Sequence, residues 1–393
     1  MQDKELNILF LLRKVNCNDG IASYCETLLD GLSKRKVRFF IASGPVYFDE
    51  HSRKRRDALA INAVEWRIYP QMRYSPRMTE FIELARFVRV QNISVINVHG
   101  LSMLLWGRTL CLVTGARLVA TYHPSAHGDL QKVRAMAAET LTATRRLLLN
   151  LLFPDKLIVL SEESKKFIER YAPRFKKRIK KIVGGVNPVF RPPLPEVRAE
   201  ARSEYGYHET DFVCLLLGRL SWNKGQDIMI DATRIVRNQH PTLDVKGLFV
   251  GIGDAELEIK ALVSSEELDR GLFRFLGYID RAQHAMWAAD VFVLPSRVEG
   301  FALVIAEAMA TGLVPIRTPS GGALDQIVEG ETGLLIPFDN PNALAQAIVA
   351  LSDAERRKVM SANCVARAAR LFSADAMFDS TRAVYVELSK RPL

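Results

Sequence analysis

Residues 292–307 read FVLPSRVEGFALVIAE, and they set the expectation for the whole chain. An apolar run indicates a buried strand, a turn holds Glu299 and Gly300, and a second apolar segment predicts a helix. Glu307 follows Glu299 by eight residues, slightly more than two helical turns, so both carboxylates can face the same side. A glycine lets the backbone approach a ligand, and the first turn of a helix favours anions. The stretch therefore predicts a polar site where a strand passes into a helix.

A second predicted strand end carries two cations. Residues 215–226 read LLLGRLSWNKGQ, in which an apolar run ends in glycine and is followed by Arg219 and Lys224. Arginine can bind a phosphate through two hydrogen bonds, and lysine acts as a point charge. A cation near the start of a helix is unfavourable without an anionic partner. The two residues therefore indicate a diphosphate site, with ordinary surface charges as the alternative.

Apolar runs alternate with helical patterns along the chain, as in open parallel sheets with helices on both faces. At 393 residues the chain exceeds the size of a single core, and the proline-rich segment 187–195 reads as a linker. We therefore predict an α/β protein of two Rossmann-like, doubly wound domains that face each other across a cleft. Ligands would bind outside the carboxyl ends of the strands. The expected strands are 6–12, 37–41, 95–98, 118–121, 157–160, 212–217, 248–250, 273–276, 291–294 and 314–316, and the expected helices include 224–239, 255–268 and 303–311.

Three residues of the first half follow predicted strands. Gly20 lies in the turn NDGI, where a glycine can cradle a phosphate, although the turn does not match G-x-G-x-x-G. His123 lies in VATYHP and His99 in INVHG. For both histidines a ligand-facing role and a hydrogen-bonded structural role are alternatives, and the structural role is favoured more for His99.

Missing motifs exclude several chemistries. The chain has no G-x-x-x-x-G-K-[ST], no G-x-S-x-G and no H-E-x-x-H, which argues against a P-loop ATPase, an α/β-hydrolase and a zinc protease. No D-x-D occurs, so cations and helix termini would have to meet the charge of a diphosphate without a metal ion. The five cysteines form no C-x-x-C and are predicted to be reduced thiols that bind no metal: Cys17, Cys25, Cys111, Cys214 and Cys364.

Positive charge is concentrated in the first half. Residues 1–190 hold 32 Lys and Arg against 17 Asp and Glu, a net +15, whereas residues 191–393 hold 22 against 27, a net −5. Residues 165–181 contain nine basic residues, and residues 53–56 read RKRR. The pattern suits an anionic membrane surface, a phosphorylated acceptor or a solvated face, and nucleic acid is disfavoured. No apolar stretch reaches about 20 residues and the start is not a signal peptide, so we expect a cytoplasmic protein, either free or peripheral on the inner face of the membrane.

The chain resembles the retaining glycosyltransferases of family 4, which have the GT-B fold. Glu299-x7-Glu307 is similar to the family's E-x7-E motif, and GRLSWNKG at 218–225 is similar to its G-R-L…K-G segment. VGIGD at 250–254, FLGYI at 275–279 and SGGALDQIVEGETGLLI at 320–336 are also similar to family blocks. The resemblance covers nearly the whole chain and is densest from residue 212 to residue 341.

The resemblance implies a reaction and a role for each domain. Residues 1–188 would form an acceptor-binding domain, residues 189–373 would bind a UDP- or GDP-linked sugar, and a helix at about 374–393 would pack back on the first domain. The sugar would be transferred with retention of its anomeric configuration and without a metal ion. The expected acceptor is a lipid-linked or lipopolysaccharide-type precursor at the membrane. The alternatives are a nucleotide-sugar epimerase or phosphorylase on the same fold, and a catalytically inactive binding protein.

The resemblance also implies a role for each candidate residue. The implied catalytic group is His123 beside the sugar, Glu299 on the sugar hydroxyls, and Arg219 with Lys224 on the donor diphosphate. The other implied donor contacts are Gly20 on the diphosphate, Tyr278 near the base, the backbone of Gly300, Phe301, Ala302 and Leu303 on the sugar and phosphates, and Glu307 on the ribose. The chain departs from the family's usual residues at Asp19, Asn187 and Asp325, none of which carries an assigned role.

Overall fold

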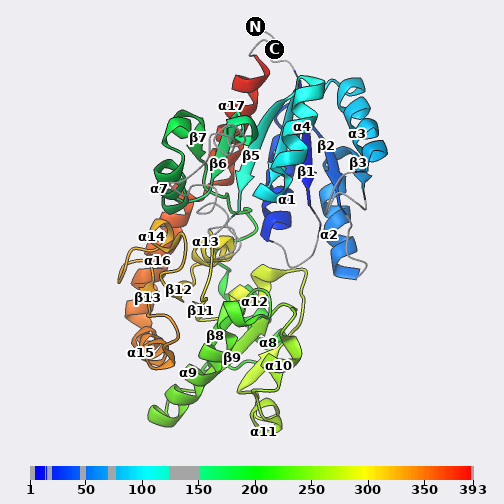
Figure 1. Ribbon diagram of the computed structural model, residues 1–393. Helices are drawn as coiled ribbons and strands as arrows, with labels where there is room; N and C mark the ends of the chain where they lie inside the picture. Colours follow the sequence, from blue (N-terminus) through cyan, green and yellow to red (C-terminus); the bar gives the residue numbers. More distant parts are fainter. Residues whose placement is uncertain are drawn as a thin grey trace. The chain divides into compact units, whose positions relative to one another are not determined.

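The computed structural model describes residues 5–13, 15, 20–44, 50–69, 77–123 and 150–390. The chain forms two compact units (Figure 1). Unit 1 comprises Met1–Gly185 together with Ala374–Leu393, and unit 2 comprises Val186–Ser373. Each unit is built on a parallel sheet, so the predicted α/β fold class is confirmed.

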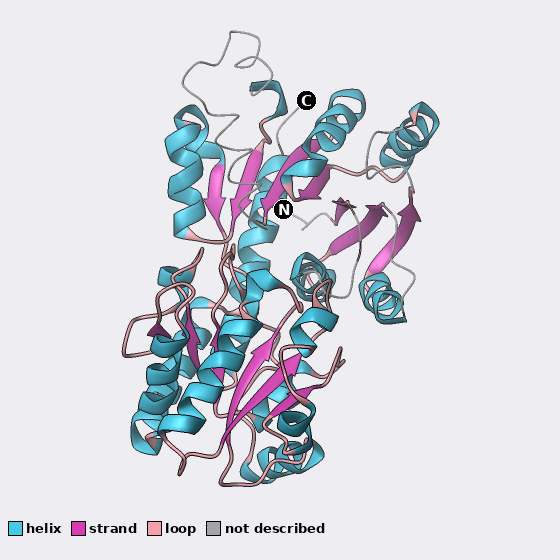
Figure 2. Ribbon diagram, turned by 60° about the horizontal axis from the view of Figure 1, so that its bottom comes forward, coloured by secondary structure: helices cyan, strands magenta, loops and turns pink. Residues whose placement is uncertain are grey.

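The sheet of unit 1 has its parallel strands in the order β3-β2-β1-β4-β5-β6-β7. Figure 2 draws the strands in magenta and the helices beside them in cyan. The strand order runs outward in both directions from β1, which makes the sheet doubly wound with a switch point between β1 and β4. Its strands are β1 (Leu6–Leu12), β2 (Val37–Ser43), β3 (Ala63–Ile68), β4 (Val95–His99), β5 (Arg117–Tyr122), β6 (Lys156–Val159) and β7 (Ile179–Lys181). Its described helices include α1 (Gly20–Ser33), α2 (Glu50–Ile61), α3 (Met78–Val90), α4 (Leu104–Thr114), α7 (Glu162–Tyr171) and α17 (Ala374–Ser389), with short 3-10 segments η2 (Leu101–Met103) and η3 (Pro173–Arg178).

Alternate side chains of the unit 1 strands face two different helical layers. Leu9 and Leu11 of β1 belong to a core that includes residues of α3, α4 and α7. Phe10 lies between them in the sequence and faces the opposite layer, where its ring packs edge-on against Phe39 with centroids 5.0 Å apart. The almost continuous apolar sequence of β1 follows from this burial on both faces.

Helix α17 belongs to unit 1 although all of unit 2 separates it from the other unit 1 elements in the sequence. A Cβ on Gly31 of α1 would lie 2.0 Å from the ring of Phe378, so the glycine lets α1 and α17 approach closely. The buried hydroxyl of Tyr385 accepts a hydrogen bond of 2.7 Å from the Asn97 amide of β4. These contacts fix α17 against both the first helix and the sheet.

The sheet of unit 2 has its parallel strands in the order β10-β9-β8-β11-β12-β13, with a switch point between β8 and β11. The strands are β8 (Phe212–Leu217), β9 (Val245–Val250), β10 (Phe273–Phe275), β11 (Val291–Leu294), β12 (Val314–Arg317) and β13 (Leu334–Leu335). The helices are α8 (Pro195–Glu204), α9 (Gln226–Gln239), α10 (Glu256–Lys260), α11 (Ser265–Asp269), α12 (Ala282–Ala288), α13 (Leu303–Ala310), α14 (Ala323–Gln326), α15 (Pro341–Ser352) and α16 (Ala354–Leu371), with the 3-10 turn η4 (Trp222–Lys224).

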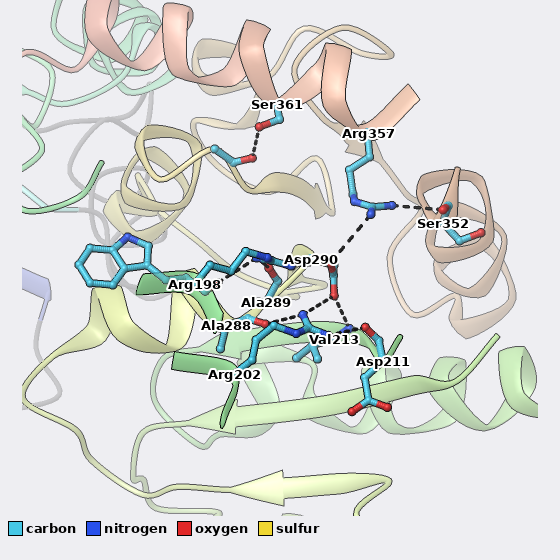
Figure 3. A network of polar contacts seen from close by, with 12 residues as sticks. Arg198, Arg202, Asp211, Val213, Ala288, Ala289, Asp290, Ser352, Arg357 and Ser361 are labelled. Atoms are coloured by element: carbon cyan, nitrogen blue, oxygen red, sulfur yellow. Dashed lines mark hydrogen bonds and ion pairs between the residues drawn. The ribbon is translucent and has the colours of Figure 1, made fainter. Parts of the chain in front are cut away.

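A largely buried carboxylate, Asp290, joins helices of unit 2 to the start of its central strands (Figure 3). It accepts hydrogen bonds from the Val213 backbone N–H at 2.8 Å and from Arg198 and Arg202 of α8 at 2.8 and 3.1 Å. Arg357 of α16 lies 3.9 Å away. Because the charge is matched and hydrogen-bonded on several sides, we assign this network to stability, not to chemistry.

The strands predicted at 6–12, 212–217 and 291–294 are confirmed with the same bounds. The predicted helix 255–268 is wrong: it is two short helices, because Ser264 and Glu267 form a capping box that starts α11. The edge strands β3 and β7 were not predicted. None of the six residues of β3 is fully buried and β7 has three residues, so neither produces a clear apolar pattern.

The two helices next to the candidate site also differ at their ends from the prediction. The helix predicted at 224–239 begins at Gln226, since Gly225 adopts a left-handed conformation with φ 75° and leaves Lys224 in the preceding turn η4. The helix predicted at 303–311 ends at Ala310, with Thr311 as its C-terminal cap.

Candidate functional site

The loops that follow β8, β9, β11 and β12 meet at the carboxyl edge of the unit 2 sheet. A Cβ on Gly251, which has φ 129°, would lie 2.1 Å from the Gly218 carbonyl oxygen, so the loop after β9 touches the loop after β8. A Cβ on Gly321 would lie 2.5 Å from the Glu299 carbonyl oxygen, so the loop after β12 touches the loop after β11. Glycine permits both close approaches.

The central contact at this edge joins Lys224 and Glu299. Lys224 Nζ donates to Glu299 Oε1 at 2.5 Å, and Ser296 Oγ donates to the same oxygen at 2.8 Å. The Glu299 side chain is 9% exposed and the Lys224 side chain 25% exposed. Burial by itself would raise the pKa of Glu299, but Lys224, Arg317 and Ser296 together hold this pKa below its ordinary value. Glu299 is therefore an ionised and largely buried carboxylate.

Arg317, the last residue of β12, organises the loop that follows it. Its fully buried guanidinium donates to the carbonyl oxygen and to Oγ of Ser320, each at 3.0 Å, and to the side-chain oxygen of Gln326. The Gln326 amide donates in turn to the carbonyl oxygen of Ala302 at 2.8 Å. A chain of hydrogen bonds thus connects β12 with the segment that leads into α13.

Helix α13 begins at Leu303, as predicted, so Gly300, Phe301 and Ala302 precede its first turn. The residue at the N-terminal cap, Ala302, has no side-chain oxygen that could accept hydrogen bonds from the first-turn N–H groups. Such an uncapped first turn favours an anionic ligand. Glu307 lies one turn further along α13 and is half-buried.

Arg219 lies on the same loop as Lys224, after β8, and Tyr278 lies on the loop after β10. The carbonyl oxygen of Arg219 accepts from Gln226 Nε2 at 2.8 Å. Its half-buried guanidinium has no ion-pair partner among the residues that the structure describes, so Arg219 does not join the ion pair of Lys224. Tyr278 follows Gly277, whose carbonyl oxygen accepts from the Gly251 N–H at 2.7 Å after β9.

Unit 1 brings two histidines together at the carboxyl ends of β4 and β5. His99 Nδ1 lies 3.2 Å from His123 Nε2 and 3.5 Å from Cys25 Sγ of α1. Tyr24 packs edge-on against His123 with ring centroids 5.0 Å apart, and Phe10 packs against His99 at 4.7 Å. The buried His99 therefore holds the partly buried His123. A structural role was the favoured alternative for His99.

Burial determines the protonation of this cluster. It lowers the pKa of His123 to about 3, and it lowers the pKa of His99 well below its usual range, with repulsion from His123 adding to the shift. Burial also raises the pKa of the Tyr24 hydroxyl, with a smaller contribution from Cys25. All three rings are neutral near pH 7.

The remaining predicted residues are less informative. Gly20 is the exposed first residue of α1, with no atom within 4 Å of the position of a Cβ, and the turn residues 16–19, Cys17 included, lie outside the described part of the chain. Cys25, Cys111, Cys214 and Cys364 are buried free thiols. Among the described residues, no group of histidine, cysteine or acidic side chains could hold a metal ion. In the same part of the chain, no helix combines the length and the apolar character needed to cross a bilayer.

Sequence reasoning missed three residues that support the site: Ser296, Arg317 and Gln326. The signal for Arg317 was available, because an arginine closes the apolar run VPIR and must find partners if the run is buried. Ser296 and Gln326 lie in loop and short-helix segments without periodicity, so no pattern points to them.

Two family models match the chain, one in each half. Residues 18–190 match the model described as Glycosyltransferase Family 4, and residues 211–354 match the model described as Glycosyl transferases group 1. Two doubly wound parallel α/β units, with charged loops at a sheet edge, define the GT-B class of fold. The chain belongs to the group 1 glycosyltransferases of family 4.

Individual relatives match parts of the chain. The D-inositol 3-phosphate glycosyltransferase of Pseudarthrobacter chlorophenolicus is 31% identical over 197 residues, 49% of this chain and 46% of that protein. The lipopolysaccharide core biosynthesis mannosyltransferase LpsB of Rhizobium meliloti is 34% identical over 209 residues, 51% of this chain and 58% of that protein. The chain thus spans about half the length of these curated relatives.

A solved structure matches nearly the whole fold. The crystal structure of Anabaena Alr3699/HepE in complex with UDP-glucose superposes with a TM-score of 0.76 over 97% of this chain and 100% of that chain. The sequence identity is 21%, so this likeness shows a shared GT-B fold.

Proposed function

We propose that this protein transfers a sugar from a nucleoside-diphosphate sugar to an acceptor hydroxyl, with retention of the anomeric configuration. The observation that carries the proposal is the Lys224–Glu299 ion pair at the carboxyl edge of the unit 2 sheet. An ionised, mostly buried carboxylate suits hydroxyl groups of a sugar, and an adjacent lysine suits a phosphate. Family membership and the uncapped start of α13 support the same chemistry.

The roles follow from the local surroundings of each side chain. We propose that Lys224 leaves Glu299 for the donor diphosphate, that Arg219 adds a second cation, and that Glu299 then accepts hydrogen bonds from the transferred sugar. Arg219 is suited because its guanidinium has no ion-pair partner among the described residues. Glu307 on α13 would bind the ribose, the backbone from Gly300 to Leu303 would contact sugar and phosphates, and Tyr278 would neighbour the base. Gly20 and His123 of unit 1 would contact the diphosphate and the sugar.

The test is a calorimetric titration of UDP, GDP and their sugar conjugates without metal, followed by a transfer assay. Lys224→Met should weaken diphosphate binding by at least tenfold, since a charge-assisted hydrogen bond contributes about 1.5–3 kcal/mol. Glu299→Gln should reduce transfer much more than it reduces UDP affinity. The matched control is Lys260→Met, which breaks a half-buried Lys260–Glu256 pair of 2.7 Å in the same unit. Unchanged transfer in both site variants, or turnover of the donor into an epimer or a sugar phosphate, would exclude this function.

We propose further that the acceptor is anionic or membrane-bound and that the basic segment 165–181 faces it. Two acids pair with lysines of this segment: Glu162, just before it, lies 3.8 Å from Lys165 and 3.2 Å from Lys181, and Glu169 lies 3.7 Å from Lys176. These acids neutralise part of the positive charge, so the 3-10 turn η3 is the most basic part of the segment 165–181.

Three exposed cations of η3, Arg174, Lys177 and Arg178, form no ion pair with a described residue. The fourth, Lys176, is the one that pairs with Glu169. The guanidinium groups of Arg174 and Arg178 lie 5.2 and 5.3 Å from the ring centroid of the buried Phe175, which holds them in place. A fixed group of cations on a surface suits phosphates of a lipid head group or of a lipopolysaccharide-type acceptor. The relative LpsB, named as a lipopolysaccharide core mannosyltransferase, favours this class.

Three of the four cations in the second basic cluster, residues 53–56, have acidic partners. Lys54 lies 3.2 Å from Glu50, and Arg56 lies 2.6 Å from Asp57. Arg55 forms an ion pair with Glu26 of α1. The cluster at 53–56 therefore provides a matched control for η3.

Cosedimentation with vesicles that contain anionic lipid measures the membrane contribution. Each basic residue near such a surface contributes about 1 kcal/mol. Replacing Arg174, Lys177 and Arg178 by glutamine should therefore lower binding by about a hundredfold. The double variant Lys54→Gln, Arg56→Gln should bind as the unaltered protein does. Equal binding of both variants would refute the role of η3 without affecting the donor site.

A further inference from the structure

We propose that His99 is a positioning residue that holds His123 in one neutral tautomer, with the proton on Nδ1, so that His123 offers a fixed N–H donor to an oxygen of the transferred sugar. The second half of this statement rests on the proposed function, and the first half stands on the geometry of unit 1 alone.

A single proton can lie between the facing nitrogens of His99 and His123. His99 Nδ1 and His123 Nε2 are 3.2 Å apart, and the two ring planes differ by 28° with centroids 5.5 Å apart. A neutral imidazole has one donor nitrogen and one acceptor nitrogen. One of the two facing atoms therefore carries a proton and the other accepts it, which couples the tautomer of His123 to that of His99.

The other ring nitrogen of His99 determines which of the two facing nitrogens is the hydrogen-bond donor. His99 Nε2 is buried and has no hydrogen-bond partner in the part of the chain that the structure describes. A proton there would leave a buried donor unpaired, which proteins avoid. The proton of His99 is therefore on Nδ1, where it has His123 Nε2 at 3.2 Å and Cys25 Sγ at 3.5 Å as acceptors.

The tautomer of His123 follows directly. Because His123 Nε2 accepts, and because burial keeps the ring neutral, its own proton is on Nδ1. Tyr24 packs edge-on against His123 and Phe10 packs against His99, so the neighbours that hold the rings carry no charge near neutral pH. An imidazole in water exchanges between its tautomers, whereas this pair presents one donor. A donor fixed before the ligand arrives needs no reorganisation during the reaction.

Nuclear magnetic resonance of the full chain with 15N-labelled histidine tests the tautomer independently of any activity. His123 and His99 should each show a protonated Nδ1 and an unprotonated Nε2 at pH 7. The exposed His240 of unit 2 serves as the reference for averaging between tautomers. A protonated Nε2 on His123, or averaging like that of His240, would overturn the proposal.

Two substitutions at His99 separate positioning from packing. His99→Phe keeps a ring of similar shape without a hydrogen bond, and His123 should then average between tautomers. His99→Asn keeps an amide N–H near the position of Nδ1, and the His123 tautomer should be restored. If His123 keeps its Nδ1 proton in the phenylalanine variant, His99 does not determine it.

Transfer kinetics of the His99 variants test whether the His123 tautomer matters for sugar transfer. kcat/KM for transfer should fall by about tenfold in His99→Phe, the size of one hydrogen bond, and should recover in part in His99→Asn. UDP affinity should be equal in all variants, because the proposed diphosphate ligands Arg219 and Lys224 are in unit 2. A wild-type protein that binds no nucleotide would refute the proposed function, while the spectra would still decide the tautomer. A rate unchanged in His99→Phe despite a changed tautomer would refute the donor role of His123.

Discussion

Replacing Arg317 by methionine removes the buried cation that connects β12 to the loop holding Ser320. The substitution keeps most of the aliphatic volume but leaves the Ser320 carbonyl and the Gln326 side-chain oxygen without their donor. It also removes a positive charge that lowers the pKa of Glu299. Breaking a buried charged network of this kind costs about 3–5 kcal/mol. Since folded domains are stable by only about 5–15 kcal/mol, the variant should lose a large part of the stability of unit 2.

Urea unfolding followed by circular dichroism measures the loss, and thermal melting should show a decrease of roughly 6–20 °C. The control is Arg297→Met. Arg297 also follows a central strand and binds two acids, Asp227 at 2.7 Å and Asp339 at 2.6 Å, but its side chain is 30% exposed. A partly exposed ion pair contributes less than a buried one, so Arg297→Met should cost clearly less stability than Arg317→Met. Equal destabilisation of the two variants would refute the reasoning that burial makes Arg317 structurally essential.

Three further predictions concern unit 2. Asp290→Asn keeps the shape of the side chain but removes the charge that its arginine partners face, so the free energy of unfolding should fall by about 3 kcal/mol in urea, and a change below 1 kcal/mol would contradict the structural role of the network. Gly251→Ala should weaken UDP binding in calorimetry, because its Cβ would meet the Gly218 carbonyl at 2.1 Å in a backbone conformation with φ 129°; unaltered affinity would mean that this loop contact does not shape the site. The folded-state pKa of Glu299 is lowered, so its contribution to stability is fully present above the ordinary glutamate pKa of about 4.3 and is lost as the pH falls through the folded-state value. The stability difference between the unaltered protein and Glu299→Gln should therefore shrink below about pH 4 in chemical unfolding, and a difference that stays constant with pH would exclude the ionised pair as its origin.

The sequence predicts the strands that are buried on both faces, because their side chains cannot alternate between apolar and polar. β8 and β11 show this, and both bear on the candidate site. The edge strand β3 has no fully buried residue, so its sequence carries no comparable signal. A different argument predicts a partner for Lys224. A cation next to the start of a helix needs an anion, and the structure provides Glu299.

Contacts between side chains were harder to predict than the elements that carry them. The register of β4 and β5 pairs His99 with Thr121, so the sequence can place His99 and His123 at one sheet edge. It cannot indicate that two rings 24 residues apart share a hydrogen bond, since that depends on rotamers and on the packing of Tyr24 from α1. Glu307 was correctly expected on the helix after Glu299, but its partners depend on loop conformations that no periodicity encodes.

The position of α17 has a consequence for the order of synthesis. Unit 1 needs α17 to cover α1 and to bond Asn97 through Tyr385, yet a ribosome makes that helix only after all of unit 2. During translation the part of α1 that packs on α17 therefore stays uncovered, while unit 2 already has its whole sequence and can fold first. The incomplete unit 1 is thus the part of the nascent chain that carries uncovered apolar surface. A permuted gene that places residues 374–390 ahead of residue 5 would remove that delay.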